Sequence, residues 1–167
     1  MKKSLRFLAV LLAVTVLSGL FAACSDQSQT DTQTPPATEA RALEDVYAHI
    51  ADLGILPEMY MLEDAYVEGY YGIAPEAVSE KVFAVADDSL LADTVIILKV
   101  AGEGSASDIA EGFREINRQR LAEMESYNPV QFQRAEDAQI GTLGEYAYYI
   151  ITDDNAAVMN IIENSIG

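Results

Sequence analysis

The sequence has 167 residues, of which 27 are acidic and ten are Lys or Arg, so its formal net charge at pH 7 is −17. Such a chain lacks the cations that nucleic-acid phosphates require, and an anionic lipid surface would repel it. Half of the residues are hydrophobic, which is enough for one buried core. The single cysteine, Cys24, cannot form an internal disulfide. Composition therefore argues against nucleic-acid binding and against a disulfide-rich scaffold.

The first 23 residues have the pattern of a secretory signal peptide. Three cations lie near its start: Lys2, Lys3 and Arg6. The apolar run over residues 7–20 is shorter than the roughly twenty residues of a membrane span, and no cations follow it as a stop-transfer flank. We therefore predict that residues 1–23 are removed; an N-terminal membrane helix is the alternative. Removal would leave seven cations against 27 acidic residues, a net charge near −20.

The residues around Cys24 resemble a bacterial lipobox. Two small residues, Ala22 and Ala23, precede the cysteine, and Phe21 stands where the lipobox pattern favours Leu. The resemblance implies cleavage after Ala23 and attachment of a diacylglyceryl group to the Cys24 thiol. Each buried methylene contributes about 0.8 kcal/mol, so several acyl chains together anchor a protein stably. An ordinary signal peptide that leaves Cys24 as a free thiol is the other interpretation.

The composition changes again after the cysteine. Residues 24–38 are rich in Gln, Thr, Ser and Asp and contain Pro35-Pro36, but no residue large and apolar enough to build a core. Such composition predicts a disordered tether. Residues 39–167 have the length and the apolar content of one globular domain.

The first part of this domain is predicted from the spacing of its apolar residues. Residues 39–53 form a helix, residues 59–73 contain a short helix ended by Gly72 rather than a strand, and residues 80–86 form a strand. The aspartates of residues 87–93 suggest a solvated turn, because their spacing fits no EF-hand calcium loop.

His49, the only histidine, lies in the first predicted helix. A histidine can act as a general base or a metal ligand. With no second histidine and no cysteine in the domain as a partner, a surface position is the favoured interpretation, and we expect no metal site and no cofactor.

Residues 94–101 form the strongest predicted strand. Its two faces are both apolar: Ile96, Leu98 and Val100 on one, Val95 and Ile97 on the other. Such a run is typical of a central strand buried on both sides. Lys99 interrupts the second face. We favour a structural role, in which it pairs with an acid at the sheet edge, over a contact with an anionic ligand.

The longest predicted helix covers residues 107–127. Its buried stripe is Ile109, Phe113, Ile116, Leu121, Met124 and Tyr127. Four cations lie on or just after it: Arg114, Arg118, Arg120 and Arg134. In so acidic a chain this clustering could mark an anion site, but an outer helix face crossed by ion pairs is the favoured explanation.

The last part of the domain begins with Asn128-Pro129, which can cap and start a short helix. Two strands, residues 138–143 and 145–152, are joined tightly at Gly144. Tyr146 and Tyr148 share one face of the second strand; they could stack on a sugar but more often serve as core residues. A final helix follows, capped by Asp153 or its neighbour.

These elements predict an α+β fold. We expect a small antiparallel sheet of about four strands, packed with one long helix and two or three shorter helices that cover one face.

Several short stretches of the domain occur together in one family. They are Tyr71-Gly72-Ile73, Ile97-Leu98-Lys99, Asn117 to Arg120, Tyr127-Asn128-Pro129 and Gly144-Glu145-Tyr146. From Leu56 onward the chain resembles a bacterial lipoprotein family that carries the domain of unknown function numbered 4358. The resemblance implies an exported, lipid-anchored domain and implies no activity.

Five residues are the candidate ligand or partner surface: Lys99, Arg120, Tyr127, Tyr146 and Tyr148. The first three are family-like positions that packing alone does not explain. A deep pocket lined by these side chains would indicate a small ligand, whereas a flat apolar patch would indicate a protein partner.

The predicted function is a non-enzymatic binding or protein-interaction module at the cell envelope. It would be held on the extracytoplasmic face of the cell membrane through the lipid on Cys24, with an envelope protein as its possible partner. The alternative is an envelope hydrolase that uses paired carboxylates. No GxSxG or HExxH motif supports that alternative. A transporter solute-binding subunit usually has two domains around a cleft, and this domain is too small for one.

Overall fold

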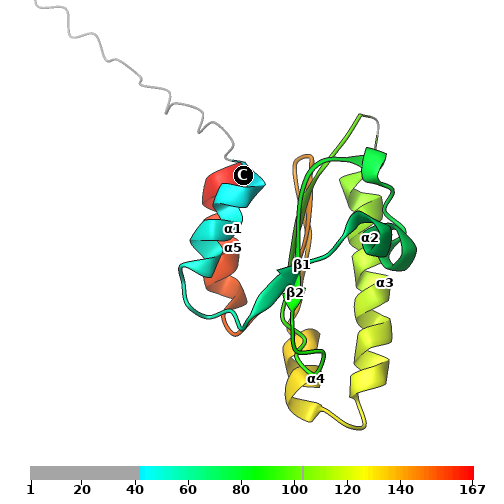
Figure 1. Ribbon diagram of the computed structural model, residues 1–167, viewed down its shortest axis with the longest axis vertical. Coiled ribbons are helices and arrows are strands. Elements are labelled where there is room, and N and C mark those ends of the chain that lie inside the picture. Colours follow the sequence, from blue (N-terminus) through cyan, green and yellow to red (C-terminus); the bar gives the residue numbers. More distant parts are fainter. Residues whose placement is uncertain (1–41, 103) are drawn as a thin grey trace, which may run out of the picture. The chain divides into compact units, whose positions relative to one another are not determined.

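A computed structural model describes residues 42–102 and 104–167, and the leader, Cys24 and the predicted tether lie outside them (Figure 1). The strands in this part of the chain are β1 (Met59–Met61), β2 (Val78–Ala86), β3 (Thr94–Val100), β4 (Gln139–Leu143) and β5 (Tyr146–Ile151). The helices are α1 (Leu43–Ala51), α2 (Asp64–Tyr71), α3 (Ala106–Met124), α4 (Pro129–Glu136) and α5 (Asn155–Ile166), and Pro75–Ala77 form a short 3-10 helix.

The strands form one antiparallel sheet in the order β1-β2-β3-β5-β4. This confirms the α+β fold, with five strands among the described residues instead of about four. The prediction that β3 is central is also confirmed, since Ile97 lies between Val82 of β2 and Tyr148 of β5.

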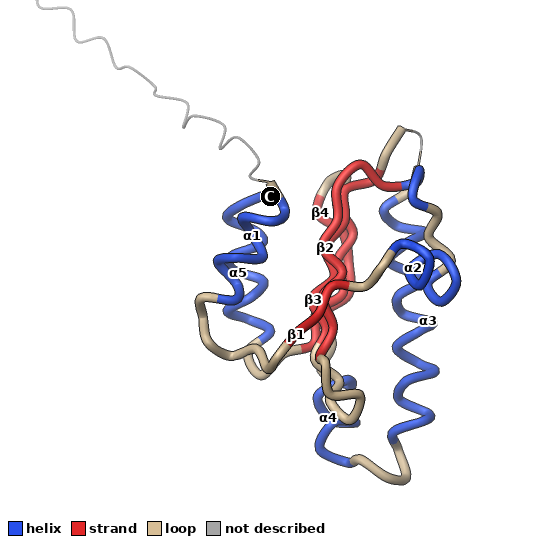
Figure 2. The backbone as a smooth tube through the Cα atoms, in the orientation of Figure 1, coloured by secondary structure: helices blue, strands red, loops and turns tan. Residues whose placement is uncertain are grey.

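Helices cover both faces of the sheet, so the expectation of one covered face was wrong (Figure 2). Figure 1 shows α1 and α5 against one face and α2 and α3 against the other. The reason is the two-sided apolar character of the central strands. Residues Val82, Val95 and Ile97 pack with α1 and α5, and residues Phe83, Ile96 and Leu98 pack with α2 and α3.

Side-chain caps fix where α3, α4 and α5 begin. Asn128 accepts a hydrogen bond from the Gln131 amide and starts α4, as predicted, and Asp154 caps α5 through the Ala157 amide. α1 has no cap of its own; the Glu80 carboxylate of β2 accepts the hydrogen bond of the Leu43 amide instead. This bond ties the first helix to the sheet.

Two glycines adopt turn conformations that would be strained for other residues. Gly72 ends α2 with φ 66° and Gly144 joins β4 to β5 with φ 56°, both in the left-handed region. Both positions agree with the predicted helix end and the predicted tight turn.

Three local expectations differ from the structure. The short helix ended by Gly72 is confirmed as α2, but residues 59–61 before it, where no strand was expected, form the edge strand β1 because they pair with Ala84–Ala86 of β2. Tyr127 is 64% exposed instead of buried, because α3 ends at Met124 and the chain then turns. Asp93 belongs to the loop that was expected to be solvated, yet it is buried.

Candidate ligand-binding groove

A groove with a volume of about 270 Å³ lies where β1, α2, the β2–β3 loop and the end of α3 meet. We call it the tyrosine groove, after the residues that line it: Tyr60, Tyr66, Tyr70, Tyr71 and Tyr127, with Arg120. Four of these tyrosines, all except Tyr71, are 47–64% exposed. Side chains that are large and partly apolar are thus left open to solvent at one place, which is unusual unless something covers them.

Helix α2 builds the aromatic wall of the groove. Tyr66 and Tyr70 are four residues apart, so they lie on one face of the helix, and their rings stack with centroids 5.6 Å apart. Tyr70 meets the edge of Tyr71 at 5.0 Å, and Tyr71 in turn meets Phe83 at 5.3 Å. Tyr71 is buried, which raises the pKa of its hydroxyl. The open rings are therefore held in place by rings of the core.

Arg120 of α3 lies half-buried in the lining of the groove. Its Nη1 donates to the carbonyl oxygen of Ala92 at 3.2 Å and to the hydroxyl of Thr94 at 3.0 Å. Its guanidinium carbon is 5.6 Å from the ring centroid of Tyr149, a buried residue whose pKa burial raises to about 12. The N–H groups on Nε and Nη2 are neither bonded to the described residues nor buried. Arg120 therefore has donors left for a ligand.

Arg120 also differs in charge pairing from the other Lys and Arg residues that the structure describes. The other five all have a carboxylate partner: Lys81 with Asp64, Lys99 with Glu145, Arg114 with Glu111, Arg118 with Glu111 and Glu115, and Arg134 with Asp93 and Asp153. Within residues 42–102 and 104–167, Arg120 is the single Lys or Arg without one. This is notable in a chain with a large excess of acids.

Asp93 reaches the lining of the groove, but its side chain has no exposed surface. Arg134 donates from Nη1 to Asp93 Oδ2 at 2.6 Å, and Asp93 Oδ1 is buried with no hydrogen-bond partner. Burial raises the pKa of Asp93, although the neighbouring guanidinium opposes the rise. The side chain stabilises Arg134 and is not free to act on a ligand.

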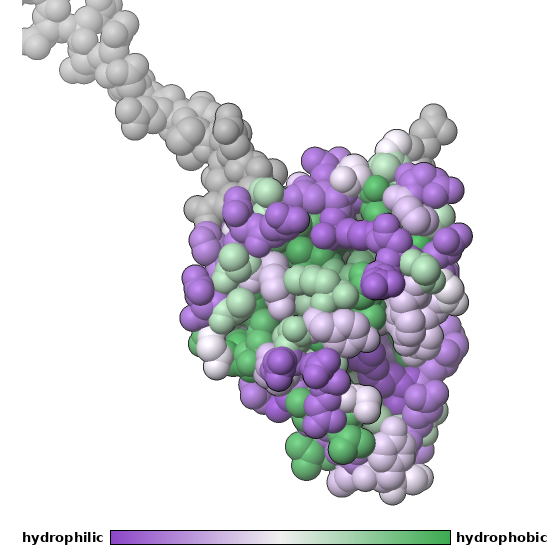
Figure 3. All heavy atoms as spheres, in the orientation of Figure 1, coloured by the Kyte–Doolittle hydropathy of each residue, from purple (hydrophilic) through white to green (hydrophobic). Residues whose placement is uncertain are grey.

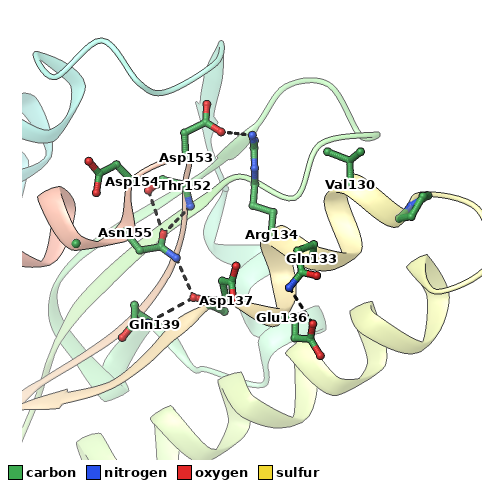
Figure 4. A pocket seen from close by; sticks show the side chains of 13 residues that line it. Val130, Gln133, Arg134, Glu136, Asp137, Gln139, Thr152, Asp153, Asp154 and Asn155 are labelled. Carbon is green, nitrogen blue, oxygen red and sulfur yellow. Dashed lines mark hydrogen bonds and ion pairs between the residues drawn. The ribbon is translucent and has the colours of Figure 1, made fainter.

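A second, larger depression of about 1050 Å³ surrounds Arg134, Asp153 and Asn155 (Figure 4). Its polar groups already have partners. Arg134 bridges Asp93 and Asp153, and the Asn155 side chain bonds to the backbone N–H of Thr152 at 2.8 Å and to the Asp137 carbonyl at 2.9 Å. Because its one cation, Arg134, already pairs with two carboxylates, this depression is a weaker candidate than the tyrosine groove.

The structure divides the five predicted surface residues into two groups. Arg120 and Tyr127 lie in the tyrosine groove. Lys99 and Tyr146 pair across β3 and β5, and Lys99 Nζ lies 2.9 Å from Glu145 Oε1 and 5.5 Å from the Tyr146 ring centroid. Tyr146 is buried, and half-buried Tyr148 packs over Gly141, where an added Cβ would lie 2.6 Å from the tyrosine hydroxyl. The favoured structural role of Lys99 agrees with this pairing.

The other predicted sites have simple placements. Cys24 and Ala23 lie outside the described residues. His49 is exposed in the last turn of α1. The predicted arginine cluster does not form one anion site, since Arg114 and Arg118 pair with acids of their own helix while Arg134 lies on α4. In the part of the chain that is described, no group of three His, Cys, Asp or Glu side chains is arranged to hold a metal ion.

None of the described helices is long and apolar enough to cross a membrane.

Sequence reasoning missed four of the groove tyrosines: Tyr60, Tyr66, Tyr70 and Tyr71. The four-residue spacing of Tyr66 and Tyr70 was a usable signal, because it places both rings on one face of a helix. Tyr60 gave none, since its place in the groove depends on the pairing of β1 with β2.

The fold and the groove define a small α+β domain with a groove lined by tyrosines. Residues 53–152 match the family described as Domain of unknown function (DUF4358), and the chain belongs to this family. The matched region contains the whole sheet and every groove residue named above, but neither α1 nor α5. No curated protein and no solved structure matches the chain significantly.

Proposed function

We propose that this protein is a non-enzymatic binding module, anchored by a lipid on Cys24 at the extracytoplasmic face of a bacterial cell membrane, and that the tyrosine groove is its ligand site. The leader, the small residues before Cys24 and the polar spacer support the anchor. The single observation that supports the binding role most strongly is the combination of open tyrosine rings with Arg120, a cation that lacks a carboxylate partner among the described residues.

The character of the surface favours a ligand in the groove over a broad protein interface. Figure 3 views the side that carries β1 and α2, where hydrophobic residues lie among many hydrophilic ones. Protein interfaces of standard size bury about 800 Å² on each partner around an apolar centre. A groove of about 270 Å³ with mixed aromatic and polar lining suits a smaller, more polar ligand.

The carboxyl groups of the groove argue against the hydrolase alternative. A glycosidase needs a general acid with a raised pKa that can reach the glycosidic oxygen. Asp93 has a raised pKa, but its side chain has no exposed surface and is held by Arg134. The other two groove carboxyls, Asp87 and Glu123, are exposed to solvent.

Cross-linking in intact cells tests the proposed site. A photoreactive amino acid would replace Tyr66 in the groove or, as a matched control, Leu53, which is 40% exposed just beyond α1. We expect cross-links from position 66 that position 53 does not give, and their loss when Tyr70→Ala is added. Equal cross-linking from both positions, or no effect of Tyr70→Ala, would show that the groove is not the binding site.

A further inference from the structure

Resting on the proposed function, we infer that the tyrosine groove takes a saccharide that carries a carboxylate, with the sugar ring against the tyrosines and the carboxylate against Arg120. Two independent features of the groove support this class of ligand: the aromatic wall, and the guanidinium of Arg120, which has no carboxylate partner among the described residues.

The wall suits a sugar ring because its surfaces are flat, rigid and amphipathic. Pyranose rings have C–H faces that pack on aromatic rings and hydroxyl edges that require hydrogen bonds. Tyrosine offers both an apolar ring and a polar hydroxyl. All five aromatic residues that line the groove are tyrosines, and two exposed carboxylates, Asp87 and Glu123, lie beside them as hydrogen-bond acceptors. A purely apolar ligand would form no hydrogen bonds with these polar groups.

Arg120 adds the requirement for a negative charge. The planar guanidinium binds carboxylates through parallel N–H bonds, and a half-buried charge is screened less by water and salt than a surface charge. Nη1 is fixed by Ala92 and Thr94, so the guanidinium is already oriented while Nε and Nη2 stay unbonded among the described residues. The exposed Asp87 and Glu123 oppose an anion only weakly, because solvent screens them.

Saturation-transfer NMR on the full-length chain in detergent measures binding to this site. The chain has no Trp, so irradiation of aromatic protons excites only its Tyr, Phe and His rings. The probes are two matched pairs, N-acetylmuramic acid with N-acetylglucosamine and glucuronic acid with glucose. N-acetylglutamate serves as a carboxylate without a sugar ring. The two acidic sugars distinguish a lactyl ether from a uronic acid as the source of the charge.

We expect acidic sugars to bind about ten- to hundredfold more tightly than their neutral partners, the range expected for a charge-assisted hydrogen-bond pair. Arg120→Gln should bring this ratio close to one, whereas Arg118→Gln, on the same helix but outside the groove, should leave it unchanged. Tyr70→Ala should weaken acidic and neutral sugars alike. Since Arg120 also bonds to Ala92, circular dichroism must show that the variant is folded.

A measurement on the unaltered chain makes the test independent of that variant. Binding of the acidic sugar should weaken as salt is raised, and binding of the neutral sugar should not. Equal affinity for acidic and neutral sugars would overturn the role of Arg120. N-acetylglutamate binding as tightly as the acidic sugars, or no saccharide binding at all, would overturn the saccharide class. If groove-dependent cross-links in cells persist in those cases, the ligand class is wrong and the proposed function stands; if they are absent too, both fail.

Discussion

Asn117 connects three elements of the core, and its removal is the sharpest test of how the domain is held together. Asn117 lies on the inner face of α3 and is only 8% exposed. The Tyr149 hydroxyl of β5 donates to Asn117 Oδ1 at 2.8 Å, and Asn117 Nδ2 donates to the Ala135 carbonyl of α4 at 2.9 Å. One amide thus satisfies two buried polar groups on neighbouring elements.

The expected magnitude follows from the groups that lose a partner. Asn117→Ala leaves the buried Tyr149 hydroxyl without its partner and removes one hydrogen bond of the Ala135 carbonyl, which still accepts from the Ala138 amide. An unsatisfied buried group costs about 1–3 kcal/mol and a lost hydrogen bond about 0.5–1.5 kcal/mol, so the free energy of unfolding should fall by about 1.5–4.5 kcal/mol. Tyr149→Phe leaves only Asn117 Oδ1 without a hydrogen-bond donor, so it should lower the free energy of unfolding by less, about 1–3 kcal/mol.

Urea unfolding followed by circular dichroism measures both losses. The double variant should be less destabilised than the sum of the single variants, with a coupling of about 0.5–3 kcal/mol, because both remove the same bond. Asn164→Ala is the matched control, since Asn164 is exposed and bonds within α5, and it should change stability by less than about 0.5 kcal/mol. A loss below about 1 kcal/mol for Asn117→Ala, or strict additivity, would refute this explanation.

Three further predictions concern the loop, the turn and the domain boundary. Because burial raises the pKa of Asp93, the folded state binds its proton more tightly than the unfolded state; this contribution to stability is present in acid and is lost as pH rises through the folded pKa. Asp93→Asn should remove that decline, which begins near the ordinary Asp pKa of about 3.9. Thermal melts over a pH series measure it, and a stability difference between the variant and the unaltered chain that stays constant as the pH rises would contradict it. Gly144→Ala meets no atom within 4 Å but keeps φ 56°, so it should cost about 1–2 kcal/mol in urea unfolding, and no loss would mean that the turn changes its conformation. Removal of residues 1–38 should leave a domain that unfolds cooperatively; aggregation without a cooperative transition would mean that the boundary is misplaced.

The sequence predicted best those parts of the fold that are determined locally. The apolar residues of β3 indicated a central strand. Gly72 marked the end of α2, Gly144 marked the turn between β4 and β5, and Asn128 marked the start of α4. The same β3 pattern also implied two covered faces, because a strand that is apolar on both sides needs packing on both. The prediction that helices cover only one face of the sheet did not take this into account.

The groove could be predicted only in part, because it depends on contacts between distant residues. Arg120 and Tyr127 were candidates from the sequence, but Tyr60 reaches the groove only through the pairing of β1 with β2. The sequence also could not show which of the described arginines lacks a carboxylate partner within that part of the chain. Arg118 and Arg120 look alike in the helix, yet the first pairs with Glu115 while the second turns toward Ala92.

The lipid on Cys24 is the claim on which the proposed location depends, and one labelling experiment tests it most directly. Cells that express the full chain or its Cys24→Ala variant would be fed an alkyne-bearing fatty acid, and the purified protein would be examined for label and for intact mass. The account predicts label on the cleaved chain, and an unlabelled, uncleaved precursor for Cys24→Ala. Equal labelling of both proteins, or an unlabelled chain that keeps residues 1–23, would contradict it.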